Sequence, residues 1–261
     1  MLRSLWQFRG FIASLVWRDL RSRTARTVWG HAWLVIEPAI QIVIYVVIFS
    51  EVLRARLPGT QDRLSYSIYV TAGLLSWNFF AELVLGGRTL FLEYADLLRT
   101  IRFPRSTLPL ALLLRSAINA AIPAVIFLAL LLWLGRWPGT LLLAALPYLA
   151  IQTVLTIGLA VWVATLNVFI RDVGNAVGVL FQFWFWLTPI VYPLSVVPES
   201  VRTWLDWNPM LHVVAAYQRI LVEGLPPEPG MLMPLSLTAL GVTGLAWSTF
   251  RVLSPDLVDE L

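Results

Sequence analysis

Residues 116–135 read SAINAAIPAVIFLALLLWLG, twenty positions without a charged side chain. A helix of this length crosses a bilayer core about 30 Å thick. The rest of the chain has the same character, since 59% of its 261 residues are hydrophobic, only 13% are charged and the mean hydropathy is +0.77. A soluble domain carries about 25% charged residues, so the sequence predicts a polytopic membrane protein. Further charge-free runs lie at 64–81, 137–170, 173–198 and 229–250.

These runs predict an all-α protein with six transmembrane helices. The first helix is interrupted by Glu37 beside Pro38, at the end expected to face the cytoplasm. The run 137–170 is long for one span and short for two, and one tilted helix fits it better. The expected spans are about 30–52, 66–88, 109–134, 140–169, 174–193 and 231–251.

The distribution of arginine predicts the orientation. Six Arg precede the first span and four follow the second, whereas the alternate loops carry fewer. Basic residues stay in the cytoplasm during insertion, so the N-terminus and, after six spans, the tail 255–261 are expected inside. This topology accounts for the net charge of +4 better than a nucleic-acid partner does. The expected cytoplasmic residues are Arg3, Arg9, Arg18, Arg21, Arg23, Arg26, Arg88, Arg99, Arg102 and Arg105.

Missing residue types exclude several kinds of chemistry. The chain has no cysteine, which excludes disulfides, thiolate metal sites, iron–sulfur clusters and cysteine nucleophiles. Its two histidines, His31 and His212, are too few for a histidine-built metal site. All 19 basic residues are Arg, and without a lysine there is neither a phosphate-binding loop nor Schiff-base chemistry. We therefore expect no catalytic residue, no metal ligand and no ATPase site in this chain.

The N-terminal segment, 1–28, is predicted to contain a cytoplasmic amphipathic helix over residues 3–25. Such a helix lies in the membrane interface, and it is also suited to docking a cytoplasmic partner. Its apolar face is formed by Leu5, Phe8, Ile12 and Leu15, and its polar face by Arg3, Gln7, Ser14, Arg18 and Arg21.

Residues 90–105, LFLEYADLLRTIRFPR, form the most informative cytoplasmic segment. Leu90, Tyr94, Leu97 and Ile101 recur at helical spacing, and Pro104 ends the pattern. The segment is either an interfacial connector whose arginines set the topology or a helix held in place for a partner to push.

Residues 195–226 are predicted to form two short amphipathic helices, separated by Asn208-Pro209, that dip into the outer interface. The ionisable residues Glu37, Glu82 and Arg115 each stand near a span end. Snorkelling explains them, which argues against proton-coupled transport.

Aromatic residues concentrate in the second and fifth spans. One interpretation is a lipid-facing belt together with core packing. The other is a lining on which sugar rings stack. Composition does not choose between them. The candidate substrate-path residues are Tyr69, Trp77, Phe80, Phe181, Trp184 and Tyr192.

Four motifs in order give the chain a family resemblance. They are Trp17-Arg18-Asp19-Leu20 with Gly30, Trp33 and Pro38; Leu97-Leu98-Arg99 with Phe103-Pro104-Arg105-Ser106 and Leu108-Pro109-Leu110; Asn167 to Val173 (NVFIRDV); and Thr188-Pro189-Ile190-Val191-Tyr192 with Trp207-Asn208-Pro209. With six spans between them, the chain resembles the membrane subunit of type-2 ABC exporters, in the branch that exports O-antigen, capsular polysaccharide or teichoic acid.

The resemblance implies a homodimeric pore in the bacterial inner membrane, with two separate ATPase subunits that bind ATP and magnesium. It implies a type-2 transmembrane domain over 30–254, an interface helix carrying Arg18, Asp19 and Arg21, re-entrant outer helices over 195–226, and a lipid-linked polysaccharide as substrate. The coupling helix would be 93–105, and its ATPase-coupling residues would be Glu93, Asp96, Leu97, Arg99, Arg102, Phe103, Pro104 and Arg105.

Two other functions stay open at this point. A type-2 exporter of a drug or small lipid would not need a continuous aromatic path. A membrane-embedded lipid-linked sugar transferase needs acidic residues that converge at the interface, and Glu51, Asp62, Asp172 and Asp206 are instead scattered over both sides.

Overall fold

The computed structural model describes residues 6–24, 29–52, 57–58, 62–101 and 103–261. Over these ranges the chain forms helices and no strands. The α-helices are α2 (Arg9–Thr24), α3 (Trp33–Val47), α4 (Arg63–Gly87), α5 (Leu90–Glu93), α6 (Ala95–Thr100), α7 (Thr107–Trp133), α8 (Ala145–Phe169), α9 (Asp172–Trp186), α10 (Glu199–Leu205), α11 (Pro209–Gln218) and α12 (Leu232–Leu253).

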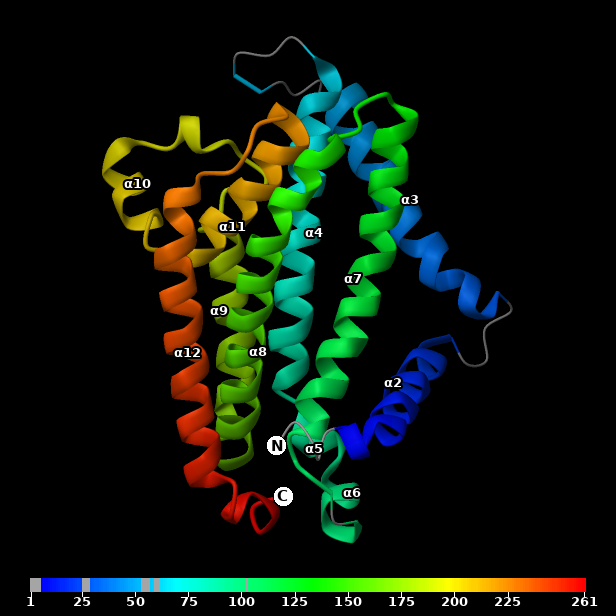
Figure 1. Ribbon diagram of the computed structural model, residues 1–261, viewed down its shortest axis with the longest axis vertical. Coiled ribbons are helices and arrows are strands. Elements are labelled where there is room, and N and C mark those ends of the chain that lie inside the picture. The colour runs from blue at the N-terminus through cyan, green and yellow to red at the C-terminus, as the bar shows by residue number, and fades with distance from the viewer. Residues whose placement is uncertain (1–5, 25–28, 53–56, 59–61, 102) are drawn as a thin grey trace.

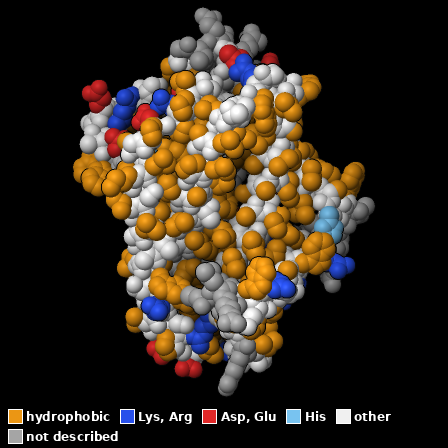
Figure 2. Space-filling view, in the orientation of Figure 1, with side chains coloured by type: hydrophobic (Ala, Val, Ile, Leu, Met, Phe, Trp, Pro, Cys, Tyr) orange, Lys and Arg blue, Asp and Glu red, His pale blue; other side chains and the backbone are white. Residues whose placement is uncertain are grey.

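Five helical segments of the described chain are long and apolar enough to cross a membrane. Helices α4, α7, α8, α9 and α12 run roughly side by side along the long axis, whereas α3 slants away from them (Figure 1). Hydrophobic side chains cover the middle of the face shown in Figure 2, and charged side chains gather toward its two ends. The five segments are Gly30–Val52, Leu64–Gly87, Thr107–Trp133, Gly139–Phe169 and Pro229–Leu253.

The expected fifth span, 174–193, is a shorter helix. Helix α9 ends at Trp186, and its 15 residues rise roughly 22 Å. The expected end at residue 193 is therefore wrong. Pro189 explains the difference, because proline cannot donate to the helical ladder and turns the preceding residue toward an extended conformation.

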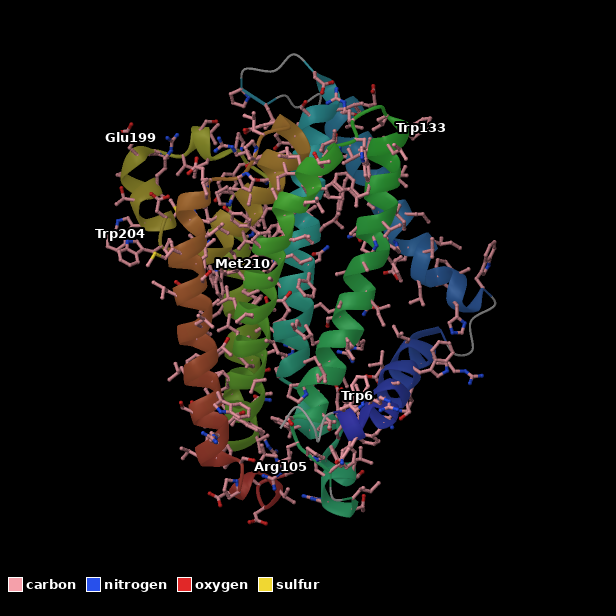
Figure 3. All side chains as sticks on the ribbon, viewed as in Figure 1. Trp6, Arg105, Trp133, Glu199, Trp204 and Met210 are labelled. Atoms are coloured by element: carbon pink, nitrogen blue, oxygen red, sulfur yellow. The ribbon has the colours of Figure 1, made fainter. Side chains whose placement is uncertain are left out.

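The two ends of the bundle carry different elements (Figure 1). Helices α2, α5 and α6 and the last turn, Asp256–Val258, lie at one end, which we call the α6 end. Helix α10 projects near the opposite end, the α10 end, where Figure 3 shows Trp204 pointing outward. Trp204 is 79% exposed, whereas Met210, at the start of α11, is fully buried.

Helix α2 packs onto the bundle through one apolar face. Ile12, Leu15, Val16 and Leu20 are buried in a cluster with residues of α5, α6 and α7. The expected helix over 3–25 thus corresponds to α2, although residues 1–5 and 25–28 lie outside the described part of the chain.

The apolar spacing over 90–105 predicts one helix, with 93–105 as the coupling helix, but the segment is broken into two short helices. Helix α5 ends at Glu93, Tyr94 leaves the helical conformation with ψ at 17°, and α6 then ends at Thr100. Ile101 is extended, with φ at −122° and ψ at 132°. The expectation of a continuous helix is wrong, since burial of Tyr94 between the two pieces takes precedence over the regular spacing of apolar residues.

Small residues allow the long helices to approach closely, as is common inside membranes. A Cβ on Gly158 of α8 would lie 2.9 Å from the Cα of Thr243 of α12. A Cβ on Gly87 would lie 2.5 Å from the carbonyl oxygen of Ala160. These contacts hold α8 against α12 on one side and against the end of α4 on the other.

Candidate functional site

A groove of about 840 Å³ runs between α4 and α9. One side of it is open, because Val179 and Trp186 are 53% and 63% exposed. Asn175 begins the groove near the α6 end and Trp186 closes it, a rise of roughly 16 Å along α9. The lining consists of Trp77, Ala81, Leu85, Arg88, Asn175, Gly178, Val179, Phe181, Gln182, Phe185 and Trp186.

The wall of the groove rests on a compact aromatic cluster formed by Trp77, Phe80, Phe181 and Trp184. The ring centroids of Phe80 and Phe181 are 5.1 Å apart, and those of Phe181 and Trp184 are 5.5 Å apart. Phe80 is fully buried, and neither Phe80 nor Trp184 lines the groove. Trp77 and Phe181 each expose only 6% of their surface, at the groove wall.

The two expected path tyrosines instead support the turn that follows α9. The hydroxyl of Tyr69 donates to the carbonyls of Pro189 and Tyr192, both at 3.2 Å. The hydroxyl of Tyr192 donates to the carbonyl of Trp186 at 2.6 Å. Gln218 also donates to the Pro189 carbonyl, at 3.3 Å. These side chains satisfy carbonyls that the broken helix leaves unpaired.

Asn167 fixes the two sides of the groove relative to each other at the α6 end. Its Nδ2 donates to the carbonyl of Arg88, which caps α4, at 2.6 Å. Its Oδ1 accepts from the N–H of Gly174, in the first turn of α9, at 2.6 Å. A Cβ on Gly174 would lie 2.7 Å from this oxygen. The motif of residues 167–173 therefore has a structural role that its sequence did not reveal.

The carboxylate of Asp19 joins three elements at the α6 end. It accepts from the hydroxyl of Tyr94, at 3.1 and 3.0 Å, and pairs with Nη1 of Arg115 at 3.2 Å. The Arg18 guanidinium lies over the Tyr94 ring at 5.3 Å. Burial, together with the negative charge of Asp19, raises the pKa of the Tyr94 phenol, so this hydroxyl stays a donor. Sequence reasoning missed Tyr94 and Arg115 as partners of Asp19, because nothing in the spacing brings residues 19 and 115 together.

The expected coupling residues form the outer surface of this end. Glu93, Asp96 and Arg99 are exposed, and Leu97 is half-buried against the cluster below. Glu93 accepts from the hydroxyl of Thr89 at 2.6 Å. Arg102 lies outside the described residues, and Pro104 follows it in the loop that leads to α7. The ring of Phe103 packs at a tilt against that of Phe11 in α2, with their centroids 5.1 Å apart. Arg105 donates to the hydroxyl of Ser254 at 3.0 Å, and Arg21 is exposed on α2.

A second, smaller cavity of about 240 Å³ lies between α3, α4 and α7. Glu37 and Glu82 both line it, and Glu82 accepts from Asn119 at 2.6 Å. Among the residues with described positions, no group of three or more His, Asp or Glu side chains could hold a metal ion.

The comparisons with known proteins agree over most of the chain. Residues 11–222 match the ABC-2 type transporter family. The chain is 31% identical over 253 residues to the O-antigen export system permease protein RfbA of Myxococcus xanthus, covering 96% of this chain and 95% of that one. It is 27% identical to the protein of the same name from Klebsiella pneumoniae, with 79% and 78% covered. It is 21% identical to the polysialic acid transport protein KpsM of Escherichia coli, with 92% of each chain covered. The chain therefore belongs to the ABC-2 type transporter membrane family.

Proposed function

We propose that this chain is the transmembrane subunit of an ATP-driven exporter that moves a lipid-linked polysaccharide, in the first place an O-antigen, across the bacterial inner membrane. The observation that carries the proposal is similarity along nearly the full length to a permease named for O-antigen export. The groove between α4 and α9 supports it, since aromatic and amide side chains are the groups on which sugars stack and to which they hydrogen-bond.

The assembly that we propose has two copies of this chain and two copies of a separate ATPase, which binds ATP and magnesium. The absence of lysine is the reason to place hydrolysis on another chain. The groove is open on one side in the single chain, and a second copy facing it would complete a pathway.

The membrane topology that we propose has six crossings, with α9 as a short fifth crossing and α10 and α11 as re-entrant outer helices. Helix α2 and the C-terminal turn share the α6 end, as an even number of crossings requires (Figure 1). The Arg-rich segments lie at this end, which we place in the cytoplasm. The interface segment is then 1–28, the transmembrane domain 30–254 and the tail 255–261.

The ATPase would dock on α5, α6 and the extended residues after them. This surface presents charges from Glu93, Asp96 and Arg99 around the apolar Ile101, which is 51% exposed. Asp19 would pass the movement of this surface to α2 and α7, because its carboxylate bonds both Tyr94 and Arg115.

The substrate path would follow the groove, with Trp77 and Phe181 at its wall and Phe80 and Trp184 supporting them from the core. Since Trp77 is 94% buried, Trp77→Ala combines the loss of a contact with a cavity. The variant should therefore be judged by export per molecule of membrane-inserted protein.

The proposed function is tested by deleting the gene in its own host. We expect surface polysaccharide, detected by antibody on intact cells, to disappear while lipid-linked polymer accumulates inside, and the intact gene to restore it. Unchanged surface polysaccharide together with sensitivity to a drug would instead favour a small-molecule exporter.

A further inference from the structure

The groove contains one charged side chain among the residues that line it, and this charge stands at one end. Arg88 caps α4 at the α6 end, where the proposed function places the cytoplasm. The rest of the lining is aromatic, aliphatic or amide. A ligand that matches this pattern has a single anionic group at one end and an uncharged, ring-containing body.

The Arg88 guanidinium is half-buried and makes no hydrogen bond or ion pair with any residue in the described ranges. Arg115, at the same end, pairs with Asp19, and Arg105 donates to Ser254. A guanidinium that lies in a groove without a protein acceptor keeps its N–H donors available to a ligand. An anionic ligand in the groove would supply the missing acceptor with charge-assisted hydrogen bonds.

Contacts from neighbouring helices fix the position of Arg88. Asn167 holds its backbone carbonyl at 2.6 Å, and Gly87 fixes the end of α4 against Ala160. Across the groove, Gly178 leaves room for the guanidinium, since a Cβ there would lie 3.2 Å from Nη1 of Arg88. The guanidinium is thus held over the surface of α9, within the groove.

We propose that Arg88 binds the phosphate group that joins the glycan to its lipid carrier. The adjoining aromatic and amide wall holds the first sugars, and the lipid chain lies along Val179 and Trp186, between this wall and the second copy. This inference rests on the proposed function and adds the chemical group that is recognised and the residue that recognises it. An acidic sugar polymer fits less well, because its repeated charges would meet no further cation along the groove.

A reporter in the groove tests the proposal. The chain has no cysteine, so Val179→Cys introduces a thiol that is unique in this subunit. In the purified complex with its ATPase, the rate at which this thiol reacts with a maleimide is measured with farnesyl diphosphate, farnesol or inorganic pyrophosphate added. We expect farnesyl diphosphate to slow the reaction and the other two compounds to have little effect.

Variants in the same reporter background assign the effect to Arg88. In Arg88→Gln the half-protecting concentration of farnesyl diphosphate should rise about tenfold, the loss expected for one charge-assisted hydrogen bond. For Arg88→Lys, the half-protecting concentration should lie between that of Arg88→Gln and that of the protein with Arg88. The control is Arg171→Gln, which removes an exposed charge outside the groove lining and should behave as the parent. If Arg88→Gln does not assemble, Gly178→Ala displaces the guanidinium while keeping the charge and should also weaken protection.

Three outcomes would overturn the proposal. If farnesyl diphosphate protects the thiol equally well with and without Arg88, this residue does not contribute to the site. If farnesol protects as well as farnesyl diphosphate does, the groove recognises only the lipid chain. If inorganic pyrophosphate protects equally well, the groove is an anion site that does not recognise the lipid carrier. Normal export by Arg88→Gln would also contradict the site while leaving the proposed function intact. Failure of the unmodified chain to restore surface polysaccharide contradicts the function itself.

Discussion

Asp19 holds together elements that are far apart in the sequence. Its side chain is 23% exposed and that of Arg115 is 16% exposed, so little water screens their 3.2 Å contact. Removing one member of a buried ion pair leaves the other charge uncompensated, at a cost of about 3 kcal/mol.

We therefore expect Arg115→Gln to lower the free energy of unfolding by about 3 kcal/mol. The double variant Asp19→Asn with Arg115→Gln should recover part of the loss, because no charge is then left alone. Thermal unfolding of the purified complex measures both, with Arg171→Gln as the exposed-charge control. Losses that simply add in the double variant would show that the two side chains act independently.

A second ion pair, at the α10 end, predicts a pH dependence. Desolvation acts to raise the pKa of Asp62, but hydrogen bonds from Ser65 and the Leu64 N–H, together with Arg136 at 2.6 Å, outweigh it and lower this pKa. A carboxylate with a lowered pKa stabilises the folded state above its ordinary pKa, and this contribution is lost as the pH falls through the lowered value.

Arg136→Gln should cost about 0.5 kcal/mol at neutral pH, since both side chains are about one third exposed. The difference from the unmodified protein should shrink as the pH falls below the ordinary aspartate pKa and disappear once the pH is below the lowered pKa of Asp62. Unfolding midpoints compared over that range test the prediction, and a difference that persists in strong acid would contradict it.

The short helices α5 and α6 present the surface that we assign to the ATPase. The triple variant Glu93→Ala, Asp96→Ala and Arg99→Ala removes exposed charges without opening the core, so insertion and abundance should not change. Export should fall several-fold while ATP hydrolysis persists, or the ATPase should dissociate more easily. Export per inserted molecule measures the loss of transport, and co-purification measures how firmly the ATPase is held. The control Glu199→Ala with Asp206→Ala removes exposed charges near the α10 end and should leave both quantities unchanged.

The contact between α8 and α12 depends on the absence of a side chain at Gly158. Gly158→Leu should separate the two helices, because even a Cβ would lie 2.9 Å from Thr243 Cα. We expect a loss of about 3 kcal/mol or a failure to accumulate, as for overpacked core sites. Gly241→Leu on α12 meets nothing within 4 Å and is the matched control. Equal abundance of the two variants would contradict the proposed close contact.

The sequence predicts the long helices well and their rotation poorly. Charge-free runs locate α7 and α8, because length and apolarity alone decide a span. When a helix is apolar on every side, its sequence does not show which face points toward the core. Nothing in the sequence therefore distinguishes Phe80, in the core, from Trp77, at the groove wall. The break at Tyr94 and the Asp19–Arg115 pair were equally out of reach, since both depend on contacts made only in the folded bundle.

At the level of the whole molecule, the proposed assembly makes ATP hydrolysis a property of the complex, because this chain has no lysine for a phosphate-binding loop. The purified chain alone should release phosphate from ATP no faster than buffer, and activity should appear when its ATPase is added. A preparation carrying a hydrolysis-dead ATPase is the control. Hydrolysis by the chain alone, free of contaminating ATPases, would contradict the prediction.

The two hydrogen bonds of the Asn167 side chain also determine how the groove can change width. The side-chain amide of Asn167 hydrogen-bonds the end of α4 and the start of α9, each at 2.6 Å, so the two helices cannot part at this end without breaking at least one of these bonds. Widening that keeps both bonds must proceed as a wedge, with its apex at Asn167 and its opening toward Trp186. A polymer that entered beside the apex would then meet a passage that broadens ahead of it, which favours advance over return.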